Sequence, residues 1–275
     1  MTSPGIYRNL SWDEYRAIDA WNPSSVLPGR VSALEIDYQR RHPKQSTPQM
    51  RFGSAVHCAV LEPDQFPLRY CMWEGRRAGA KYDEFRDVNE GKEVLTLSEY
   101  DACLAARDSA RKHPVASRFL TAGETEDAEV AVVWEDIHTG LLCKSRIDLL
   151  LLTIIDLKTT KTKVADDRAL TRIASRFGYH ISMAARQDAI STLTGETPDV
   201  KLIFVEQLPP YDVRVKSLPD IVMGQGYDIW QNLLSMVADC ERTGIWPGCD
   251  AGESELQVWD EGNEQVQVTL DGIVI

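Results

Sequence analysis

Long apolar runs are absent from this sequence. The neighbouring apolar stretches 149–152 and 154–155, for example, are far short of the roughly 20 apolar residues that a membrane-spanning helix needs. Residues 1–7 also lack the basic region and the apolar core of a secretory signal. We therefore expect a cytoplasmic protein that does not act at a membrane.

Cysteine is scarce and scattered. The chain has six cysteines among 275 residues, and no two of them form the Cys-x-x-Cys pair that is typical of zinc and iron–sulfur sites. This distribution argues against a disulfide framework and against an iron–sulfur cluster. We expect reduced thiols, as in most cytosolic proteins.

Positive charge is in deficit. The 30 Lys and Arg residues face 42 Asp and Glu residues, which gives a net charge of −12 and argues against a protein that binds nucleic acid by bulk electrostatics. The distribution is uneven, because 144–176 contains eight basic and four acidic residues, whereas 247–275 contains seven acidic residues and no Lys or Arg. A local basic track therefore stays compatible with nucleic acid. We expect the acidic end to aid solubility, with docking or DNA mimicry as the alternative.

The remaining composition, 43% hydrophobic and 26% charged, is that of a globular protein, and the length permits one large domain. Apolar periodicity predicts helices over 53–61, 97–112, 166–176, 179–193 and 224–243, and strands over 130–134, 141–148, 151–157 and 200–206. Residues 69–95 are expected to form an exposed arm. These elements predict an α/β fold with a mixed central β-sheet flanked by helices. We expect one domain over 1–250 and an acidic extension over 251–275, where 256–259 and 266–270 alternate as in a short hairpin.

The most informative segment contains Asp148, Asp156 and Lys158. Residues two apart on a strand face the same side, so Asp156 and Lys158 project together while Leu157 faces the core. If 141–148 and 151–157 form a hairpin, Asp148 lies beside that pair. Two carboxylates suit a hard divalent cation such as Mg²⁺, and a neighbouring lysine can position water or offset phosphate charge. The alternative is a plain Asp–Lys ion pair at a strand end.

Two further features could serve such a site. His57 lies in a largely apolar helix, where it is either a core histidine or a contact to a metal or phosphate. Arg168, Arg172 and Arg176 recur every four residues and would form one stripe on a helix. The stripe is either a solvated helix face or, next to a Mg²⁺ site, a track for a phosphate backbone.

Taken in order, these segments resemble the RecE-type exonuclease VIII group of the PD-(D/E)XK nuclease superfamily. The resemblance covers about residues 5–247 and implies a PD-(D/E)XK nuclease core. The matching motifs are, in chain order, Gly5-Ile6-Tyr7 with Tyr15, Ser24-Ser25, the segment 53–63 with His57, Lys144-x-Arg146-x-Asp148, Asp156-Leu157-Lys158-Thr159-Thr160, and Tyr179-His180.

The resemblance implies a role for each matching residue. Asp148 and Asp156 would be metal ligands together with the backbone carbonyl of Leu157. Lys158 would be the catalytic lysine and His57 an active-site contact to metal or phosphate. Glu129 is a candidate for a second metal or its water shell, with an exposed strand-edge glutamate as the alternative. Candidate DNA contacts are the basic and aromatic residues Arg76, Arg77, Arg146, Lys161, Lys163, Arg168, Arg172, Arg176 and Tyr179.

The sequence departs from this family in one helix. Members commonly read Tyr-His-x-Gln-x-x-x-Tyr, whereas Ser182 and Arg186 stand here at the Gln and Tyr positions. Gln187 lies about 100° further around the helix and is no obvious substitute. Because the expected metal ligands and the lysine are retained, we expect altered substrate handling and not loss of activity.

The resemblance implies a Mg²⁺-dependent exonuclease, of phage or bacterial type, that digests linear double-stranded DNA from its ends. It would degrade the 5′-ended strand and leave a 3′ single strand for recombination, with Mn²⁺ as a substitute metal. The family also implies a homo-oligomeric ring, such as a tetramer, and a single-strand annealing protein as partner. The alternatives are a structure-specific or endonucleolytic RecB-like nuclease and a catalytically weak DNA-binding module of the same fold.

Overall fold

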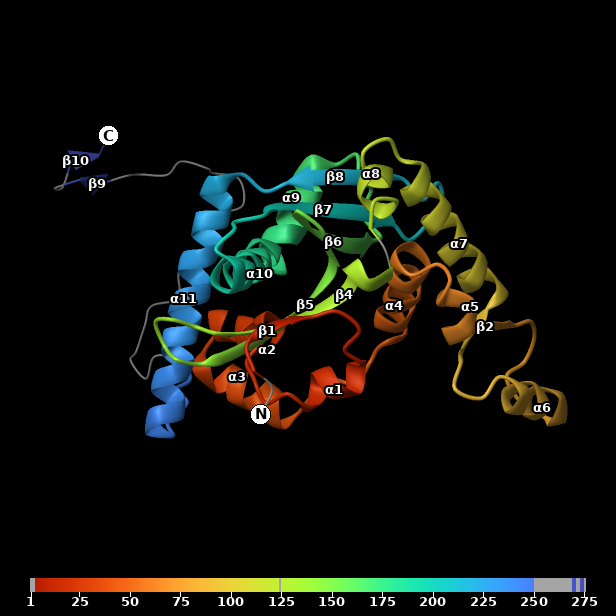
Figure 1. The fold of residues 1–275 in the computed structure, drawn as a ribbon, viewed down its shortest axis with the longest axis horizontal. Helices are drawn as coiled ribbons and strands as arrows, with labels where there is room; N and C mark the ends of the chain where they lie inside the picture. The colour runs from red at the N-terminus through yellow and green to blue at the C-terminus, as the bar shows by residue number, and fades with distance from the viewer. Residues whose placement is uncertain (1–2, 124, 250–268, 271–272, 275) are drawn as a thin grey trace.

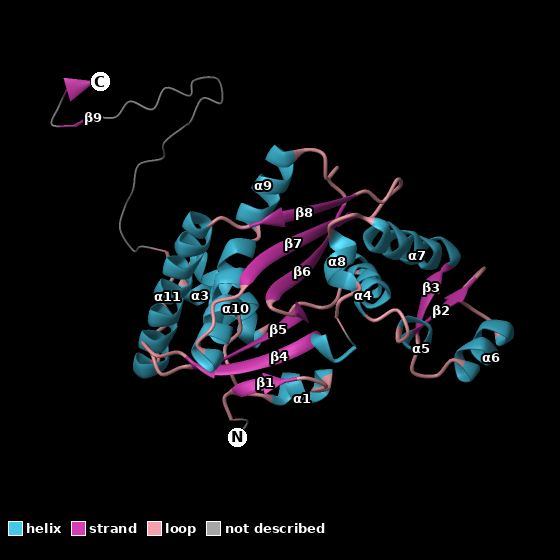
Figure 2. Cartoon of the chain, turned by 45° about the horizontal axis from the view of Figure 1, so that its top comes forward, coloured by secondary structure: helices cyan, strands magenta, loops and turns pink. Residues whose placement is uncertain are grey.

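A six-stranded sheet forms the centre of the molecule (Figure 2). The computed structural model describes residues 3–123, 125–249, 269–270 and 273–274. The strand order is β1-β4-β5-β6-β7-β8, and all neighbouring pairs are antiparallel except β6 and β7. The strands are β1 (Gly5–Tyr7), β4 (Ala128–Glu135), β5 (Leu142–Leu150), β6 (Thr153–Thr160), β7 (Asp199–Glu206) and β8 (Val213–Ser217). The mixed sheet predicted from the sequence is confirmed, although β6 begins two residues later than expected.

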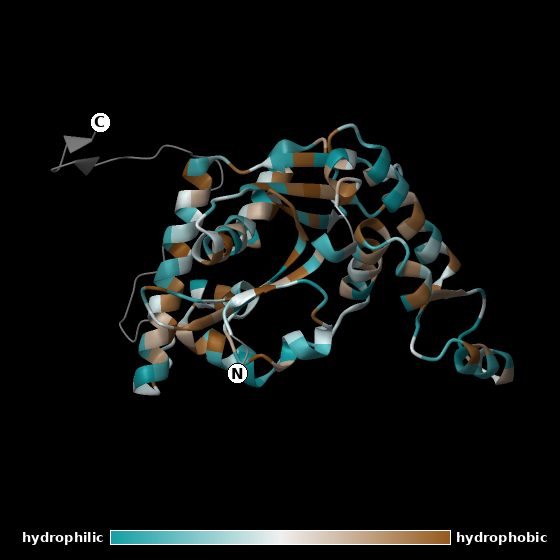
Figure 3. Cartoon of the chain, viewed as in Figure 1, coloured by the Kyte–Doolittle hydropathy of each residue, from teal (hydrophilic) through white to brown (hydrophobic). Residues whose placement is uncertain are grey.

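Helices cover both faces of this sheet, as Figure 1 shows. The helices of one face are α2 (Pro23–Val26), α3 (Ala33–Arg41), α10 (Tyr179–Thr194) and α11 (Asp220–Thr243), which share an apolar cluster with the sheet. The other face carries α4 (Pro48–Leu61) and α7 (Leu97–Lys112), which share a second cluster with β5, β6 and β7. Apolar residues concentrate on the strands in the middle of the sheet (Figure 3), since these strands are buried on both faces. The predicted α/β fold is therefore confirmed.

Two helices begin earlier than the apolar pattern predicts. The Thr47 side chain caps α4 by accepting a hydrogen bond from the Met50 amide at 3.2 Å, and Pro48 occupies the first turn. The first residues of α4 and of α11 are solvent-exposed. Apolar periodicity marks only the buried part of a helix, so the exposed first turn of α4 is found by its cap and not by its hydrophobicity.

The predicted arm over 69–95 folds as a small outlying unit. It contains β2 (Tyr70–Trp73), β3 (Glu93–Thr96) and α6 (Ala80–Val88), and the two strands pair in parallel. Figure 1 shows α6 projecting away from the sheet, and none of its residues is buried. The Trp73 ring packs on Tyr82 and Phe85 and joins α6 to β2. The arm is thus exposed, as expected, but it has its own apolar contacts.

Shorter elements connect these layers: α1 (Trp12–Ala17), η1 (Leu27–Arg30), α5 (Phe66–Arg69), α8 (Ala116–Leu120), η2 (Thr125–Asp127) and α9 (Asp167–Arg176). The two segments of the predicted C-terminal hairpin, 256–259 and 266–270, lie outside the described residues except for Thr269–Leu270. That pair forms β9 and runs antiparallel to β10 (Ile273–Val274). Within the described residues, no helix is both long and apolar enough to cross a membrane.

Candidate active site

The strands β5 and β6 separate at the position of the predicted site. Their backbones pair at two positions next to the turn. Further from the turn, where the backbones no longer pair, Asp148 Oδ2 accepts a hydrogen bond from the Leu157 amide at 2.7 Å. The carboxylate thus takes the place of a ladder bond and holds the two strands together where they diverge. This arrangement matches the predicted hairpin, in which Asp148 lies beside Asp156 and Lys158.

Glu129 lies opposite Asp148 on the neighbouring strand β4, as the register of the flanking pairs requires. Directly opposite residues of an antiparallel pair have Cβ atoms about 4.5–5.5 Å apart, so the two carboxylates are neighbours. Glu129 has a φ of 54°, a left-handed backbone conformation that is rare for a residue other than glycine. Such a conformation costs on the order of 1–3 kcal/mol and persists only where surrounding contacts enforce it.

At Glu129 on β4 and at Asp148 on β5, the side chains of each strand change the face of the sheet to which they point. Ala128 and Leu149 pack in the cluster beneath α4 and α7, whereas Val130 and Ile147 pack in the cluster beneath α10 and α11. Residues two apart on a regular strand face the same side, so this switch requires an irregular residue between them. The left-handed conformation of Glu129 supplies it.

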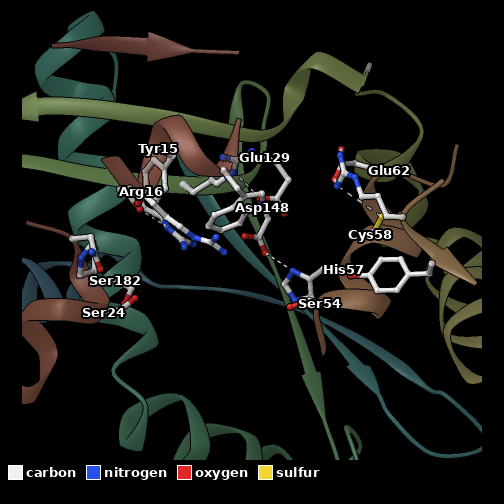
Figure 4. A pocket seen from close by; sticks show the side chains of 18 residues that line it. Tyr15, Arg16, Ser24, Ser54, His57, Cys58, Glu62, Glu129, Asp148 and Ser182 are labelled. Carbon is white, nitrogen blue, oxygen red and sulfur yellow. Dashed lines mark hydrogen bonds and ion pairs between the residues drawn. The ribbon is translucent and has the colours of Figure 1, made fainter. Parts of the chain in front are cut away.

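A group of three possible metal ligands results. Donor atoms of His57, Glu129 and Asp148 all lie within 4.8 Å of one another. His57 projects from α4, and its Nδ1 lies 3.5 Å from Asp148 Oδ2 (Figure 4). Three donors from three separate elements therefore converge on one point. His57, which the sequence left open between a core histidine and an active-site contact, is only partly buried and lies in this group.

The protonation states of this group suit cation binding. Burial lowers the pKa of His57, although the Asp148 charge opposes the shift. The imidazole is therefore neutral at pH 7 and keeps a nitrogen lone pair that can bind a cation. Burial, aided by Asp148, raises the pKa of Glu129 to about 7, against the opposing charge of Arg146. Arg146 Nε donates to Glu129 Oε2 at 3.0 Å. A cation would lower this pKa by neutralising the mutual repulsion of the carboxylates.

Asp156 is fully buried on β6 beside this group. Its carboxylate makes an ion pair with Lys158 Nζ at 2.5 Å through Oδ2 and a second ion pair with Arg186 through Oδ1. Burial alone would raise the pKa of Asp156, but the charges of Lys158 and Arg186 outweigh it and hold the pKa at about 2. Asp156 and Lys158 therefore project to the same side, as the strand periodicity predicts, and the carboxyl is ionised.

The donor set fits a hard divalent cation. Carboxylate oxygens are the preferred ligands of Mg²⁺ and Mn²⁺, and an imidazole is compatible with the latter. His57, Glu129 and Asp148 bring two carboxylates and one imidazole together, which is a donor set of this chemistry. Asp156 Oδ2 is buried beside them and is paired with Lys158 Nζ at 2.5 Å. The structure thus contains a possible metal site of acidic residues and one histidine.

His57, Glu129 and Asp148 line a pocket of about 660 Å³, whereas Asp156 and Lys158 are not among its lining residues. Figure 4 shows His57 and Asp148 on one side of it and Ser24 and Ser182 on the other. Its cationic lining consists of Arg16, Arg69, Arg146 and Arg186. A pocket that combines a group of cation ligands with a cationic lining can hold a phosphodiester and a divalent cation together.

The chain matches, over residues 31–257, the family described as a PDDEXK-like domain of unknown function (DUF3799). This match covers most of the chain. The protein belongs to this PDDEXK-like family. No curated protein matches the chain. Among solved structures, the crystal structure of a putative exonuclease from Eubacterium rectale is similar, with a TM-score of 0.60 and 13% sequence identity. The match covers 92% of this chain and 96% of that chain.

The expected DNA contacts of this PDDEXK-like domain are only partly gathered at the pocket. Arg146 lines it, with its guanidinium 4.4 Å from the centre of the Trp12 ring. Tyr179 does not line the pocket, and the centre of its ring lies 5.0 Å from Lys158 Nζ. The remaining predicted contacts do not line the pocket: Arg76, Arg77, Lys161, Lys163, Arg168, Arg172 and Arg176. The three arginines of the stripe are solvent-exposed on α9, which forms the helix that the sequence predicts. That these arginines bind DNA stays a prediction.

Several residues of the pocket carried no signal in the sequence. Arg69 forms two hydrogen bonds to Glu62, at 2.8 and 2.9 Å. Arg16 approaches from α1. These two arginines come from α1 and α5, which are far from the central motif in the chain, and only the folded structure brings them to the pocket. Ser182 and Arg186, noted as departures from the family pattern, both line the pocket.

The strain at Glu129 is testable by comparing two substitutions. Glu129→Gly is expected to leave the metal-free protein more stable than Glu129→Ala, by about 1–2 kcal/mol, because only glycine adopts a left-handed conformation without steric cost. Both variants lose the contact to Arg146, so this loss cancels when their free energies of unfolding are compared. Urea unfolding of the two proteins measures the difference.

The matched control for this prediction is Glu135 at the other end of β4, which is not among the positive-φ residues of the described chain. At Glu135 we expect the opposite order of stability, with the Glu135→Ala protein more stable than the Glu135→Gly protein, because glycine in a regular strand is destabilising relative to alanine. If Glu129→Gly were no more stable than Glu129→Ala, the left-handed backbone at this position would be wrong.

Proposed function

We propose that this protein is a Mg²⁺-dependent exodeoxyribonuclease that degrades the 5′-ended strand of linear double-stranded DNA and leaves a 3′ single strand. The observation that supports it most is the convergence of His57, Glu129 and Asp148 in an arginine-lined pocket. The Asp156–Lys158 pair is joined to this pocket through Arg186, which lines it. Ligands for a cation, a lysine and groups that bind phosphate are the components that phosphodiester hydrolysis requires.

In this proposal, Asp148, Glu129 and His57 hold the cation, with Asp156 and the Leu157 carbonyl as further ligands. A bound Mg²⁺ would polarise the scissile phosphate and lower the pKa of a coordinated water. Mn²⁺ would substitute, because it accepts the same donor set. The second-metal role first considered for Glu129 gives way here to a role in the same group as Asp148, which its position opposite that residue supports.

The protein's own side chains carry the remaining steps. Lys158 Nζ, next to Asp156, would orient the attacking water and offset the charge of the phosphate. Arg146 lines the pocket, and its Nη1 has no hydrogen-bond partner among the described residues, so its guanidinium would have a donor for a phosphate oxygen that reaches it. Its Nε is fixed by Glu129 and its guanidinium packs on Trp12, which reduces the entropy lost on binding.

The remaining parts of the proposal concern partners. A ring of identical chains around DNA and a single-strand annealing protein are implied by the family resemblance. DNA contacts by α9 and by Arg76 and Arg77 of the arm are proposed from their basic charge and their exposure. The nuclease domain is proposed to span 1–250, with 251–275 as an acidic extension. The exposed position of the arm in Figure 1 supports its proposed role in contacting a partner or DNA.

The test is digestion of linear and of covalently closed duplex DNA by the purified protein with Mg²⁺. Degradation of linear DNA alone, with loss of a 5′-terminal label before a 3′-terminal one, supports the proposal. Cutting of closed circles would instead identify an endonuclease. Absence of cutting on either substrate, with retained DNA binding, would identify a binding module.

A further inference from the structure

Arg186 enters the site from the face of the sheet opposite to His57. It projects from α10, whereas His57 projects from α4 on the other face. Its Nη1 pairs with Asp156 Oδ1, and its Nε donates to Ser145 Oγ at 3.1 Å. Only 15% of its side chain is exposed. Two contacts to β5 and β6 therefore fix this guanidinium at the point where the strands diverge.

The charge on Arg186 is permanent. A guanidinium has no accessible neutral form in proteins, so the Asp156–Arg186 pair cannot be relieved by proton loss. A cation that approached Asp156 Oδ1 would have to displace a fixed positive charge.

We propose that Arg186 restricts this centre to a single divalent cation by occupying Asp156 Oδ1. The inference rests on the proposed function, and it assigns to Arg186 a positioning role that the sequence motif does not suggest. The cation is then confined to the side of Asp148, where His57 and Glu129 are in reach. Asp156 would contribute its other oxygen, Oδ2, after Lys158 Nζ, which lies 2.5 Å from it, moves aside. The Lys158 side chain is partly exposed and is not held by a second strand as Arg186 is.

The experiment measures Mn²⁺ stoichiometry and not activity. Isothermal titration of the full chain with Mn²⁺ should give one site per chain for the wild-type protein. Arg186→Met, which removes the charge and keeps an unbranched side chain, should give two sites. Electron paramagnetic resonance should then show exchange coupling between the two ions. Arg186→Lys should restore a single site, because it restores a positive charge next to Asp156.

The matched control is Arg16→Met, which removes another arginine of the same pocket. Arg16 contacts Asp13 and the Trp12 ring but not Asp156, so this variant should keep one site. Two coupled ions in the wild-type protein would overturn the inference and leave the proposed function intact. Two sites in Arg186→Lys or in Arg16→Met would overturn it as well, and so would a folded Arg186→Met protein with one site. If the wild-type protein bound no Mn²⁺, both the inference and the proposed metal centre would be wrong.

Discussion

Replacing Lys158 by methionine is expected to reduce DNA digestion by roughly 10³-fold, within the range of 10²–10⁴ typical of a positioned acid–base group. The ammonium lies 2.5 Å from Asp156 Oδ2 and is the part of this pair that is accessible, because 22% of the Lys158 side chain is exposed and none of Asp156 is. Methionine keeps the length of the side chain but cannot orient water or offset charge. The rate of digestion of end-labelled linear duplex DNA measures the effect.

The fold is expected to survive this change. Asp156 keeps its ion pair with Arg186, so the loss of Lys158 does not leave a buried charge without a partner. Mn²⁺ binding should persist, which separates loss of chemistry from loss of the cation. Lys112→Met, at an exposed lysine at the end of α7, is the matched control and should digest DNA at close to the wild-type rate. Retention of wild-type activity by Lys158→Met would remove this lysine from the mechanism.

Asp156→Ala is a poorer test of the same site. Removing the carboxylate would leave Arg186 largely buried without its partner, and breaking a buried ion pair in this way typically costs about 3–5 kcal/mol. Loss of activity in that variant would therefore mix chemistry with unfolding. Lys158→Met avoids this problem, because Arg186 keeps its ion pair with Asp156 in that variant.

The central motif could be predicted from the sequence because its geometry is local. The alternation that places Asp156 and Lys158 on one side, and the short connection that brings Asp148 to them, depend on residues within one hairpin. The confirmed mixed sheet follows from the same local signals. In the predicted strands, apolar β-branched residues recur at strand length, which is the pattern of strands buried on both faces.

Other features depend on tertiary packing and carried no local signal. The left-handed conformation of Glu129 follows from the change of face between two apolar clusters, which no single strand reveals. The sequence showed Arg186 only as a departure from the family pattern, because its partners Asp156 and Ser145 lie on two different strands. Similarly, His57 could not be distinguished from a core histidine until α4 was placed next to β5.

Asp148→Asn is expected to weaken Mn²⁺ binding by at least about 100-fold and to abolish digestion with it. Changes to residues that merely support a ligand already cost 10–100-fold in affinity, and Asp148 is itself a predicted ligand. The asparagine keeps the shape of the side chain, and its amide oxygen can still accept the hydrogen bond from the Leu157 amide. The two strands should therefore stay joined. Titration calorimetry with Mn²⁺, together with the digestion assay, measures both effects.

A control aspartate is available at Asp13, which is exposed on α1 and contacts only Arg16 among the ion pairs of the described chain. Asp13→Asn should bind Mn²⁺ and digest DNA like the wild-type protein. Wild-type Mn²⁺ affinity in Asp148→Asn would move the cation away from His57 and Glu129, and with it the proposed active site. Because Lys158→Met is expected to lose digestion while keeping Mn²⁺, and Asp148→Asn to lose both, the two variants together distinguish the lysine's chemistry from the cation's binding.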